Sequence, residues 1–433
     1  KYFESPLLYK ENGFRKREDA EACIAYMNEA GSEATVASIE KKTEKKNPPL
    51  LFNLAELQNE CSRRFKISPD QTLSIVQELY EKKLVTYPRT DARVLSTAVA
   101  KEITKNLGGL AKIPDYLQFV KDVQNFGLYA KIANTKYTDD KKITDHYAII
   151  PTGQGLDALG SLSGVARGVY DRIVRRFLAI FYPPAVYRKL AITLSVSTES
   201  FFSNLKVLED PGYLVLYGNA EDDAEEKKPV KKEEAKDGQE AKEGQEEDKP
   251  EEAKEEILDA DMFEKISALK KGMKLPIEAI EIREGETKPP KRYNSGSLIL
   301  AMENAGQLIE DEELRAQIKG SGIGTSATRA EILNKLVKIA YLNLNRKTQI
   351  VTPTKQGEMI YEIVAASIRS LLNAELTASW EKGLTGVAEG RISETEYMEK
   401  LEGYVSKWTD GVKGLSNQGY LIERFRGLEP YYR

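Results

Sequence analysis

The residues best suited to chemistry stand in one short segment, LVTYPRTDARVLS, at positions 84–96. A residue before proline avoids the helical region, so Tyr87 should be extended. If the chain stays extended through Pro88, the side chains of Tyr87 and Arg89 point to the same side. A phenol with a pKa of about 10 becomes a nucleophile when it is deprotonated, and a guanidinium favours the phenolate and holds phosphate oxygens. This pairing suits a tyrosine that attacks a phosphodiester. A strand-edge tyrosine beside a salt-bridged arginine is the structural alternative.

His146 is the single histidine of the chain, and it lies in the segment ITDHYAIIPT. An imidazole can donate a proton or bind a phosphate near physiological pH. An incidental histidine is the alternative reading. Because no second histidine exists and no cysteine lies nearby, the sequence argues against a zinc site here.

The segment GSGIGTSATR at 320–329 is predicted to open a helix. Glycines let the backbone approach a phosphate, and the free N–H groups at a helix start attract anions. Thr328 and Glu331 also fit a capping box. The segment is neither a Walker A sequence nor a Rossmann fingerprint, so neither ATP nor NAD is predicted. An ordinary flexible loop is the alternative.

Asp259 and Asp261 form a D-x-D pair that could suggest a magnesium site. They stand where a helix is expected to begin, and acidic residues are favoured there on electrostatic grounds. We therefore predict that they cap the helix and that this chain holds no metal ligands.

The composition is that of a globular protein of two to four domains, with 433 residues. No run of about 18 apolar residues is present, so no membrane span is expected. The first residues show no signal-peptide pattern. Cys23 and Cys61 are too few for a disulfide framework, which favours a reducing cytoplasm.

The net charge of −4 hides an uneven distribution. Residues 220–256 hold 17 acidic residues and 8 lysines, which leaves 56 basic against 51 acidic residues elsewhere. A mildly basic body is compatible with nucleic acid as a partner. The acidic stretch itself has almost no apolar content, so we expect a disordered insert at 219–257.

The periodicity predicts a helix at 17–30, a strand at 34–43 and a mainly helical region from 53 to 181. Ser68 and Gln71 predict a capping box, with Pro69 at the first helical position. The helix that follows should bury Leu73, Val76, Leu79 and Tyr80, and Ser96 should cap the next helix. A last helix at 165–182 carries Arg172, Arg175 and Arg176 on one side, which usually marks a solvated face.

Alternating stretches at 190–197, 201–208, 213–217 and 275–284 predict antiparallel strands on both sides of the acidic insert. Helices follow at 295–305, 327–341, 355–372 and 393–412. The pattern as a whole is α+β.

Several of these segments together resemble type IA DNA topoisomerases, most closely the bacterial topoisomerase III branch. LYEKKLVTYPRTDARVLS is similar to the family's active-site tyrosine motif. TDHYAIIPT resembles its histidine motif, although family members often have two histidines where this chain has His146 and Tyr147. KPPKRYNSGSLILAMENAG, GSGIGTSATRAEIL and LTASWEKGLTGVAEG resemble three further stretches in the family's order. The resemblance covers residues 1–425 outside the insert.

The resemblance implies a toroid, in which a helical domain with the tyrosine is inserted into a β-rich arch. The implied domains are 1–50 as the first part of the arch, 51–185 as the tyrosine domain, 186–286 as the second part of the arch, and 287–433 as a helical domain that binds single-stranded DNA.

The resemblance also assigns roles by position. Tyr87 would form a 5′-phosphotyrosyl link that breaks one DNA strand, and no ATP would be needed because the link keeps the bond energy. Arg89 would hold the scissile phosphate, and His146 a neighbouring one. The path of the strand would follow five residues: Ser297, Gly322, Thr325, Thr328 and Arg329.

The family begins with a Toprim domain that carries a glutamate and a D-x-D magnesium site, and nothing in this chain resembles it. We therefore expect a Toprim-less fragment, a monomer that binds single-stranded DNA but does not relax DNA alone. Mg²⁺ would belong to the full-length enzyme, with its site outside this chain.

Two alternatives remain. A tyrosine recombinase would resemble an Arg…His-x-x-Arg…Tyr order, whereas Tyr87 precedes the only histidine here. A binding module without chemistry could stack bases on Tyr137, Tyr147 or Tyr293, which lie near basic residues. Replacing Tyr87 by phenylalanine separates a transesterase from such a module.

Overall fold

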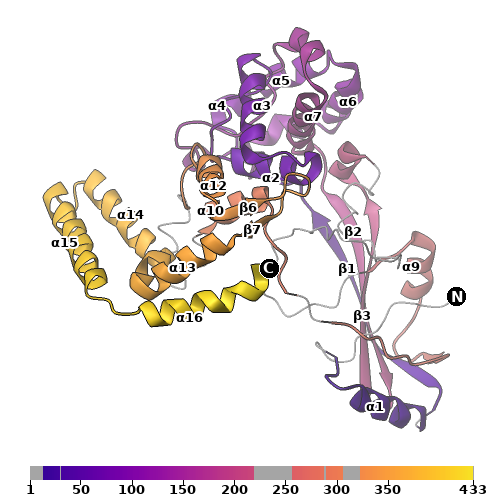
Figure 1. Ribbon diagram of the computed structural model, residues 1–433. Coiled ribbons are helices and arrows are strands. Elements are labelled where there is room, and N and C mark those ends of the chain that lie inside the picture. The colour runs from indigo at the N-terminus through magenta and orange to yellow at the C-terminus, as the bar shows by residue number, and fades with distance from the viewer. Residues whose placement is uncertain (1–12, 30, 219–255, 287–288, 306–321, 433) are drawn as a thin grey trace.

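The computed structural model describes residues 13–29, 31–218, 256–286, 289–305 and 322–432. A helical unit lies at one end of a long sheet, and a second group of helices extends sideways from beneath that unit, away from the sheet (Figure 1). The fold is α+β, as predicted. The acidic insert lies outside the described residues except for its last two positions. The domain boundaries and the closed toroid stay predictions.

The long sheet is built mainly from three antiparallel strands, and its order is β4-β3-β2-β1-β5. β1 pairs with β2 from Thr35 opposite Ser195 to Lys46 opposite Ala185. The whole helical unit therefore lies, along the chain, between two neighbouring strands. The strands are β1 (Glu33–Lys46), β2 (Ala185–Val196), β3 (Glu199–Asp210), β4 (Glu256–Ile257) and β5 (Lys274–Pro276).

Two predicted strands were wrong in type or length. Residues Gly212–Tyr217 form a 3-10 helix, η4, because Tyr213 and Leu216 turn inward to the helical core. The strand expected at 275–284 ends at Pro276, which lies opposite Glu33, because β1 begins at Glu33 and offers no further strand residue to pair with.

The helical unit has one continuous apolar core to which most of its helices contribute. Leu54, Leu57 and Cys61, which are spaced to share one face of the helix at 54–65, are all fully buried. Its helices are α2 (Leu54–Phe65), α3 (Pro69–Glu81), α4 (Thr97–Lys101), α5 (Ile103–Leu110), α6 (Pro114–Phe126) and α7 (Gly164–Ala179), with 3-10 turns η1 (Leu128–Asn134), η2 (Asp140–Lys142) and η3 (Leu156–Ser161).

The capping box that starts α3 is confirmed, since the Gln71 N–H donates to Ser68 Oγ and the Ser68 N–H donates to Gln71 Oε1. Ser96 likewise caps α4. The prediction that α3 buries Tyr80 was wrong: its side chain is 40% exposed, because it stands at the end of the helix and leans toward Tyr87.

The arginine side of α7 is not a solvated face, which corrects the prediction. Arg172 is 8% exposed and lies 2.7 Å from Glu60 Oε1, an ion-pair distance without hydrogen-bond alignment. Arg176 stacks on the Phe52 ring at 4.0 Å and donates to a backbone carbonyl. Arg175 pairs with an aspartate one turn earlier. These arginines tie α7 to α2 and to the entry of the unit.

Glu60 is the buried acid that this arginine side requires. Burial alone would raise the pKa of Glu60, but the guanidinium groups of Arg172 and Arg63 outweigh it and lower that pKa to about 2. The carboxylate is therefore charged at neutral pH, as a buried ion-pair partner should be.

Two short helices pack against the sheet outside the helical unit. α1 (Arg17–Glu29) buries Met27 against Val196, and α9 (Ala260–Ser267) buries Phe263 against the middle of the sheet. Asp259 Oδ1 accepts from the Met262 N–H at 2.8 Å, so the predicted cap is confirmed.

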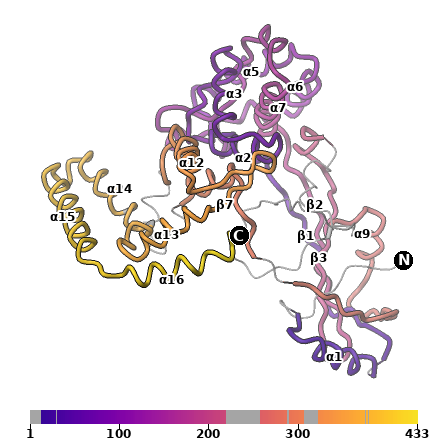
Figure 2. The backbone as a smooth tube through the Cα atoms, viewed as in Figure 1, coloured from indigo at the N-terminus to yellow at the C-terminus, as the bar shows by residue number. Residues whose placement is uncertain are grey.

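The remaining elements form the C-terminal group, which Figure 2 shows reaching away from the sheet. The helix predicted at 355–372 ends at Ser367 and continues as a 3-10 turn, and the hairpin and two of the helices were not predicted. The elements are α10 (Ser295–Glu303), α12 (Arg329–Lys338), β6 (Leu342–Leu344), β7 (Val351–Pro353), α13 (Lys355–Ser367), η6 (Arg369–Leu372), α14 (Ala374–Ala388), α15 (Glu394–Lys413), α16 (Gln418–Leu428) and η7 (Glu429–Tyr432).

α10 joins this group to the helical unit by packing on α2. Ile299 and Leu333 share a small apolar cluster with Ala55. A Cβ on Gly296 would lie 2.5 Å from the Asn59 Cα, so only glycine permits this approach. Among the described residues, no helix is long and apolar enough to cross a membrane.

Candidate functional site

The segment that carries Tyr87 runs between α3 and α4 and is hydrogen-bonded to the segment that carries His146. The Thr86 N–H donates to the Ile150 carbonyl at 3.0 Å, and the Thr86 hydroxyl donates to the Ala148 carbonyl at 3.0 Å. Thr90 Oγ1 donates to the carbonyl of His146 itself at 2.7 Å. The tyrosine and the histidine are 59 positions apart in the sequence. Hydrogen bonds from Thr86 and Thr90, on either side of Tyr87, to backbone carbonyls of the histidine segment hold them together.

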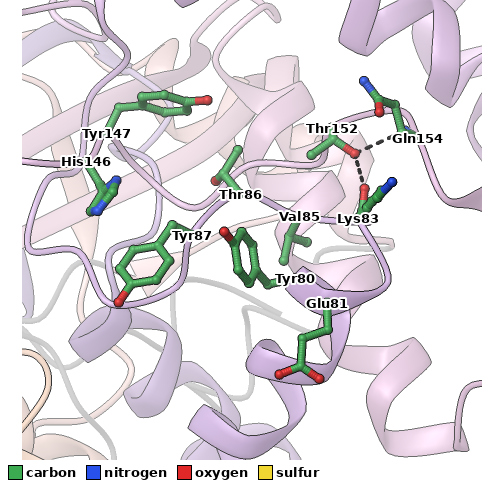
Figure 3. A pocket seen from close by; sticks show the side chains of 10 residues that line it. All are labelled: Tyr80, Glu81, Lys83, Val85, Thr86, Tyr87, His146, Tyr147, Thr152 and Gln154. Atoms are coloured by element: carbon green, nitrogen blue, oxygen red, sulfur yellow. Dashed lines mark hydrogen bonds between the residues drawn. The ribbon is translucent and has the colours of Figure 1, made fainter.

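Tyr87 lies in a pocket between two other rings (Figure 3). Its ring centroid is 4.3 Å from that of His146 and 5.5 Å from that of Tyr80, which meets it edge-on. The pocket volume is about 480 Å³. It is lined by Tyr80, Glu81, Lys83, Val85, Thr86, Tyr87, His146, Tyr147, Thr152 and Gln154.

The pocket can bring a nucleophile and a proton-carrying group to one reacting centre. His146 is exposed, so its imidazole is open to a ligand that reaches Tyr87. A phenol in contact with an imidazole can act on a phosphate ester, since the tyrosine supplies the attacking oxygen and the imidazole a hydrogen bond or a proton. The structure places these two residues together, and their catalytic roles stay predictions.

Arg89 lies outside the lining of the pocket. The chain bends at Pro88, so the extended course that would place Arg89 beside Tyr87 is not followed through. Its side chain is exposed and makes no hydrogen bond or ion pair with the described part of the chain. A guanidinium in this state can take a phosphate without first breaking another contact.

Ser297 lies in the first turn of α10, within a capping box. Its N–H donates to Asn294 Oδ1 at 2.9 Å, and its hydroxyl accepts from the Asn294 N–H at 2.9 Å. The side chain is half-buried, and the helix start to which it belongs packs on α2 through Gly296.

Gly322 begins the described part of the glycine-containing loop, which we define as residues 322–328. Its φ of +58° lies in the left-handed region, and a Cβ there would meet the Glu303 carbonyl oxygen at 2.4 Å. The next residue donates its N–H to the Met302 carbonyl at 2.7 Å. The loop is therefore packed on the last turn of α10, and the flexible-loop alternative does not describe this end of it.

Thr325 and Thr328 are both exposed on this loop and hydrogen-bond to each other. The Thr325 N–H donates to Thr328 Oγ1 at 2.9 Å. The predicted capping box with Glu331 was wrong, because the Thr328 hydroxyl is occupied by Thr325 and makes no cap bond to α12. Both hydroxyls remain accessible to solvent.

Arg329, the first residue of α12, is a predicted strand contact whose side chain is deeply buried, at 2% exposed. Its Nη1 lies 3.0 Å from Asp91 Oδ1, in the tyrosine segment. This ion pair brings the glycine-containing loop and the tyrosine segment together, from positions 238 apart in sequence.

Three residues of this region were not predicted to belong to the site: Tyr80, Asp91 and Glu303. Asp91 lies within the segment at 84–96, and its acidic character after Arg89 was an available signal. Glu303 is half-buried, and its desolvation raises its pKa to about 6 despite the nearby Arg329. No spacing rule points to Glu303, because its partners come from distant segments.

The described residues offer no site for magnesium. Within that part of the chain, no three His, Cys, Asp or Glu side chains lie together in a way that could hold a metal ion. The expectation that magnesium is held outside this chain stays a prediction.

Comparison with known proteins identifies the family. A family model described as "DNA topoisomerase" matches residues 4–399. The proteins named DNA topoisomerase 3 of Bacillus licheniformis and Bacillus subtilis are each 32% identical, over 92% and 90% of this chain. The chain spans only 49% and 48% of those two proteins.

A solved structure gives the same answer for the fold. The full-length topoisomerase I of Thermotoga maritima superimposes with a TM-score of 0.59 at 20% identity, covering 94% of this chain and 56% of that one. Because the family model matches most of this chain, the chain belongs to the DNA topoisomerase family, in the type IA, topoisomerase 3-like branch that its motifs resemble.

Proposed function

We propose that this chain carries the strand-cleaving tyrosine of a type IA topoisomerase, and that Tyr87 is that tyrosine. The observation that supports it most is the contact of the Tyr87 ring with His146 in a pocket whose backbone is fixed by hydrogen bonds. Membership of the family supplies the reaction type.

In the proposed step, the Tyr87 phenolate attacks the phosphorus of a DNA phosphodiester. The new bond joins the tyrosine oxygen to phosphorus, the bond from phosphorus to the 3′ oxygen breaks, and that oxygen takes a proton. The 5′ phosphate remains on the tyrosine until the 3′ hydroxyl attacks and reverses the step. One ester replaces another, so ATP is not required.

Arg89 and His146 serve this step through phosphate oxygens. Arg89 is exposed and holds the scissile phosphate, where a guanidinium stabilises the charge that develops on phosphorus oxygens. His146 binds a neighbouring phosphate or donates to the leaving oxygen, because its ring already lies against Tyr87.

The bound substrate in this proposal is single-stranded DNA. Thr325 and Thr328 are exposed on the glycine-containing loop, and the proposed path of the strand also passes Gly322 and Ser297. Backbone and hydroxyl contacts of this kind position a strand without reading its sequence. Binding should weaken as salt rises, since phosphates are neutralised on binding.

The complete reaction is proposed to need more than these 433 residues. Nothing in this sequence resembles Toprim motifs, and the chain spans about half the length of the curated relatives it matches. We infer that a Toprim domain with its magnesium completes the site, and that the chain acts as a monomer in the cytoplasm. Alone it binds DNA and relaxes supercoils poorly or not at all.

The test is a denaturing gel of the chain with labelled single-stranded DNA and magnesium, with and without a Toprim domain added in trans. The expected result is a slow-migrating covalent adduct that depends on the added domain. Tyr87→Phe should abolish the adduct and retain DNA affinity. Tyr361→Phe, which removes the hydroxyl of an exposed and remote tyrosine, is the matched control. DNA binding without an adduct under every condition would favour the binding-module alternative.

A further inference from the structure

The guanidinium of Arg329 is buried between two loops, and its contacts join them. Nη1 lies 3.0 Å from Asp91 Oδ1. Nε donates to the Ile323 carbonyl at 3.2 Å, and Nη2 donates to the Gly324 carbonyl at 3.2 Å. One rigid fork of donors therefore holds the tyrosine segment on one side and the glycine-containing loop on the other.

The tyrosine segment is anchored at the same point by Asn53. The Asn53 side-chain amide donates to the Asp91 carbonyl at 3.2 Å and to Glu303 Oε1 at 2.7 Å. Glu303 Oε1 lies 4.0 Å from Arg329 Nη1. Asp91, Asn53, Glu303 and Arg329 thus form one polar cluster across the junction of α2, α10 and α12.

The burial of Arg329 bears on what this arginine does. Removing a guanidinium from water is costly unless its donors are satisfied, and Arg329 meets acceptors in two separate segments. An arginine that captured phosphate from solvent would have to give up these contacts and leave Asp91 without this partner. Asp91 is only four positions beyond Tyr87, so the contact acts on the segment that carries the nucleophile.

We propose that Arg329 is a positioning residue, which fixes the distance between the tyrosine segment and the glycine-containing loop and does not itself contact DNA. The inference rests on the proposed function, because the separation of the two segments matters only if one holds the DNA strand and the other carries the attacking tyrosine. A strand held by Thr325 and Thr328 meets Tyr87 in a constant register only if the two loops are tied together. Asn53 and Glu303 support the same tie from the α2 and α10 sides.

The proposal predicts a separation of binding from chemistry. Loss of a strand contact weakens affinity, whereas loss of alignment lowers the rate of the chemical step at saturating DNA. Arg329→Gln should therefore leave the Kd for single-stranded DNA within about twofold and reduce the rate of adduct formation about tenfold or more.

The experiment uses the full chain, with hydrogen exchange, DNA affinity and adduct formation measured on each variant. Arg329→Gln removes the tie, and Asp91→Asn removes its charge from the other end at a side chain that is 44% exposed. Arg424→Gln is the matched control, because Arg424 pairs with Glu362 at 2.9 Å on the distant α13–α16 pair. If Arg329→Gln fails to fold, the same three measurements on Asp91→Asn decide whether the proposal holds.

Amides at 84–94 and 322–328 should exchange about tenfold faster in Arg329→Gln, while those of α5 are unchanged and Arg424→Gln leaves both loops unaltered. Unchanged exchange in both loops overturns the proposal, as does a general acceleration throughout the helical unit. A large loss of DNA affinity with unaltered exchange assigns Arg329 to DNA contact and also overturns it. If the wild-type chain forms no adduct with a Toprim domain present, the proposed function fails, and the exchange and affinity results still decide the role of Arg329.

Discussion

Tyr87 and His146 meet because each is flanked by backbone that bonds to the other's segment. The contact therefore does not depend on the two side chains attracting one another, and it should survive changes to either ring. Thr86 and Thr90 carry much of this arrangement through hydroxyls that donate to the carbonyls of Ala148 and His146. Tyr87 and His146 are thus positioned by their neighbours, and within the described part of the chain no hydrogen bond occupies the polar atoms of their side chains.

Glu303 should make the stability of the chain depend on pH. Burial, opposed by Arg329 and supported by Asp91 and Glu56, raises its pKa to about 6. A carboxyl whose folded pKa is raised contributes stability that is present below its unfolded pKa and is lost as pH rises through the folded value. Between pH 4.5 and 7.5 the ionised Glu303 therefore costs about 2 kcal/mol.

Glu303→Gln removes the ionisable carboxyl and with it this pH-dependent cost in stability. The amide oxygen of the glutamine can still accept the hydrogen bond from Asn53. Relative to wild type, the variant should gain about 2 kcal/mol in the free energy of unfolding between pH 4.5 and 7.5, measured in urea at each pH. Glu389→Gln, at an exposed glutamate, is the control and should show no such trend. A wild-type minus variant difference that is flat with pH would contradict the account of Glu303.

Helices and strands whose signals are local were predictable, and those that depend on distant partners were not. The Ser68 capping box and the Asp259 cap are set by residues within one turn, so their sequence patterns sufficed. The segment at 212–217 alternates like a strand, yet it turns into a 3-10 helix where it meets the helical core. The arginines of α7 read as a solvated face because Glu60 and Phe52, their partners, lie more than 100 positions earlier.

The candidate site divides in the same way. The two motifs pointed to Tyr87 and His146, whose rings lie together in the structure. Tyr80 lines the same pocket only because of its position near the end of α3. The buried position of Arg329 was not predictable, because it depends on Asp91 in a segment far back in the chain.

The packing of α10 on α2 should depend on the absence of a side chain at Gly296. A methyl group there would lie 2.5 Å from the Asn59 Cα and 2.9 Å from the Ser62 Cβ, so backbone has to move. Gly296→Ala should lower the free energy of unfolding of the junction by about 1–3 kcal/mol, typical of overpacking. Thermal unfolding followed by circular dichroism measures it.

The control for this substitution is another helical glycine with open space around it. Gly403 lies in α15, and a Cβ there would meet nothing within 4 Å. Gly403→Ala should stabilise by up to about 1 kcal/mol, through helix propensity alone. Equal effects of the two substitutions would show that the α2–α10 approach is less close than described.

At the scale of the whole molecule, packing density differs between parts of the described chain: the helical unit is well packed, and the last helices are loosely packed. The helical unit encloses one large apolar core, whereas α15 and α16 bury no residue. Elements with few buried contacts open locally at low free energy.

This difference predicts the order in which the chain opens. Amides of α15 and α16 should exchange far faster than those of α2, α3 and α7, and limited proteolysis should cut first within 373–432. Hydrogen exchange followed by mass spectrometry measures the order of amide exchange, with and without single-stranded DNA. A time course of limited proteolysis measures the order of cleavage. Protection of α15 equal to that of α7 in the free chain would contradict the packing described here.

The central claim, that Tyr87 cleaves DNA and keeps the 5′ phosphate, is tested most directly by the polarity of the covalent adduct. Single-stranded DNA labelled at its 3′ end or at its 5′ end is incubated with the chain, magnesium and a Toprim domain, and the products are separated under denaturing conditions. The account predicts that only the 3′-labelled DNA gives a labelled adduct, and that Tyr87→Phe abolishes it. An adduct that carries the 5′ label, as a recombinase-like 3′-phosphotyrosyl link would, or an adduct that survives Tyr87→Phe, would contradict the claim.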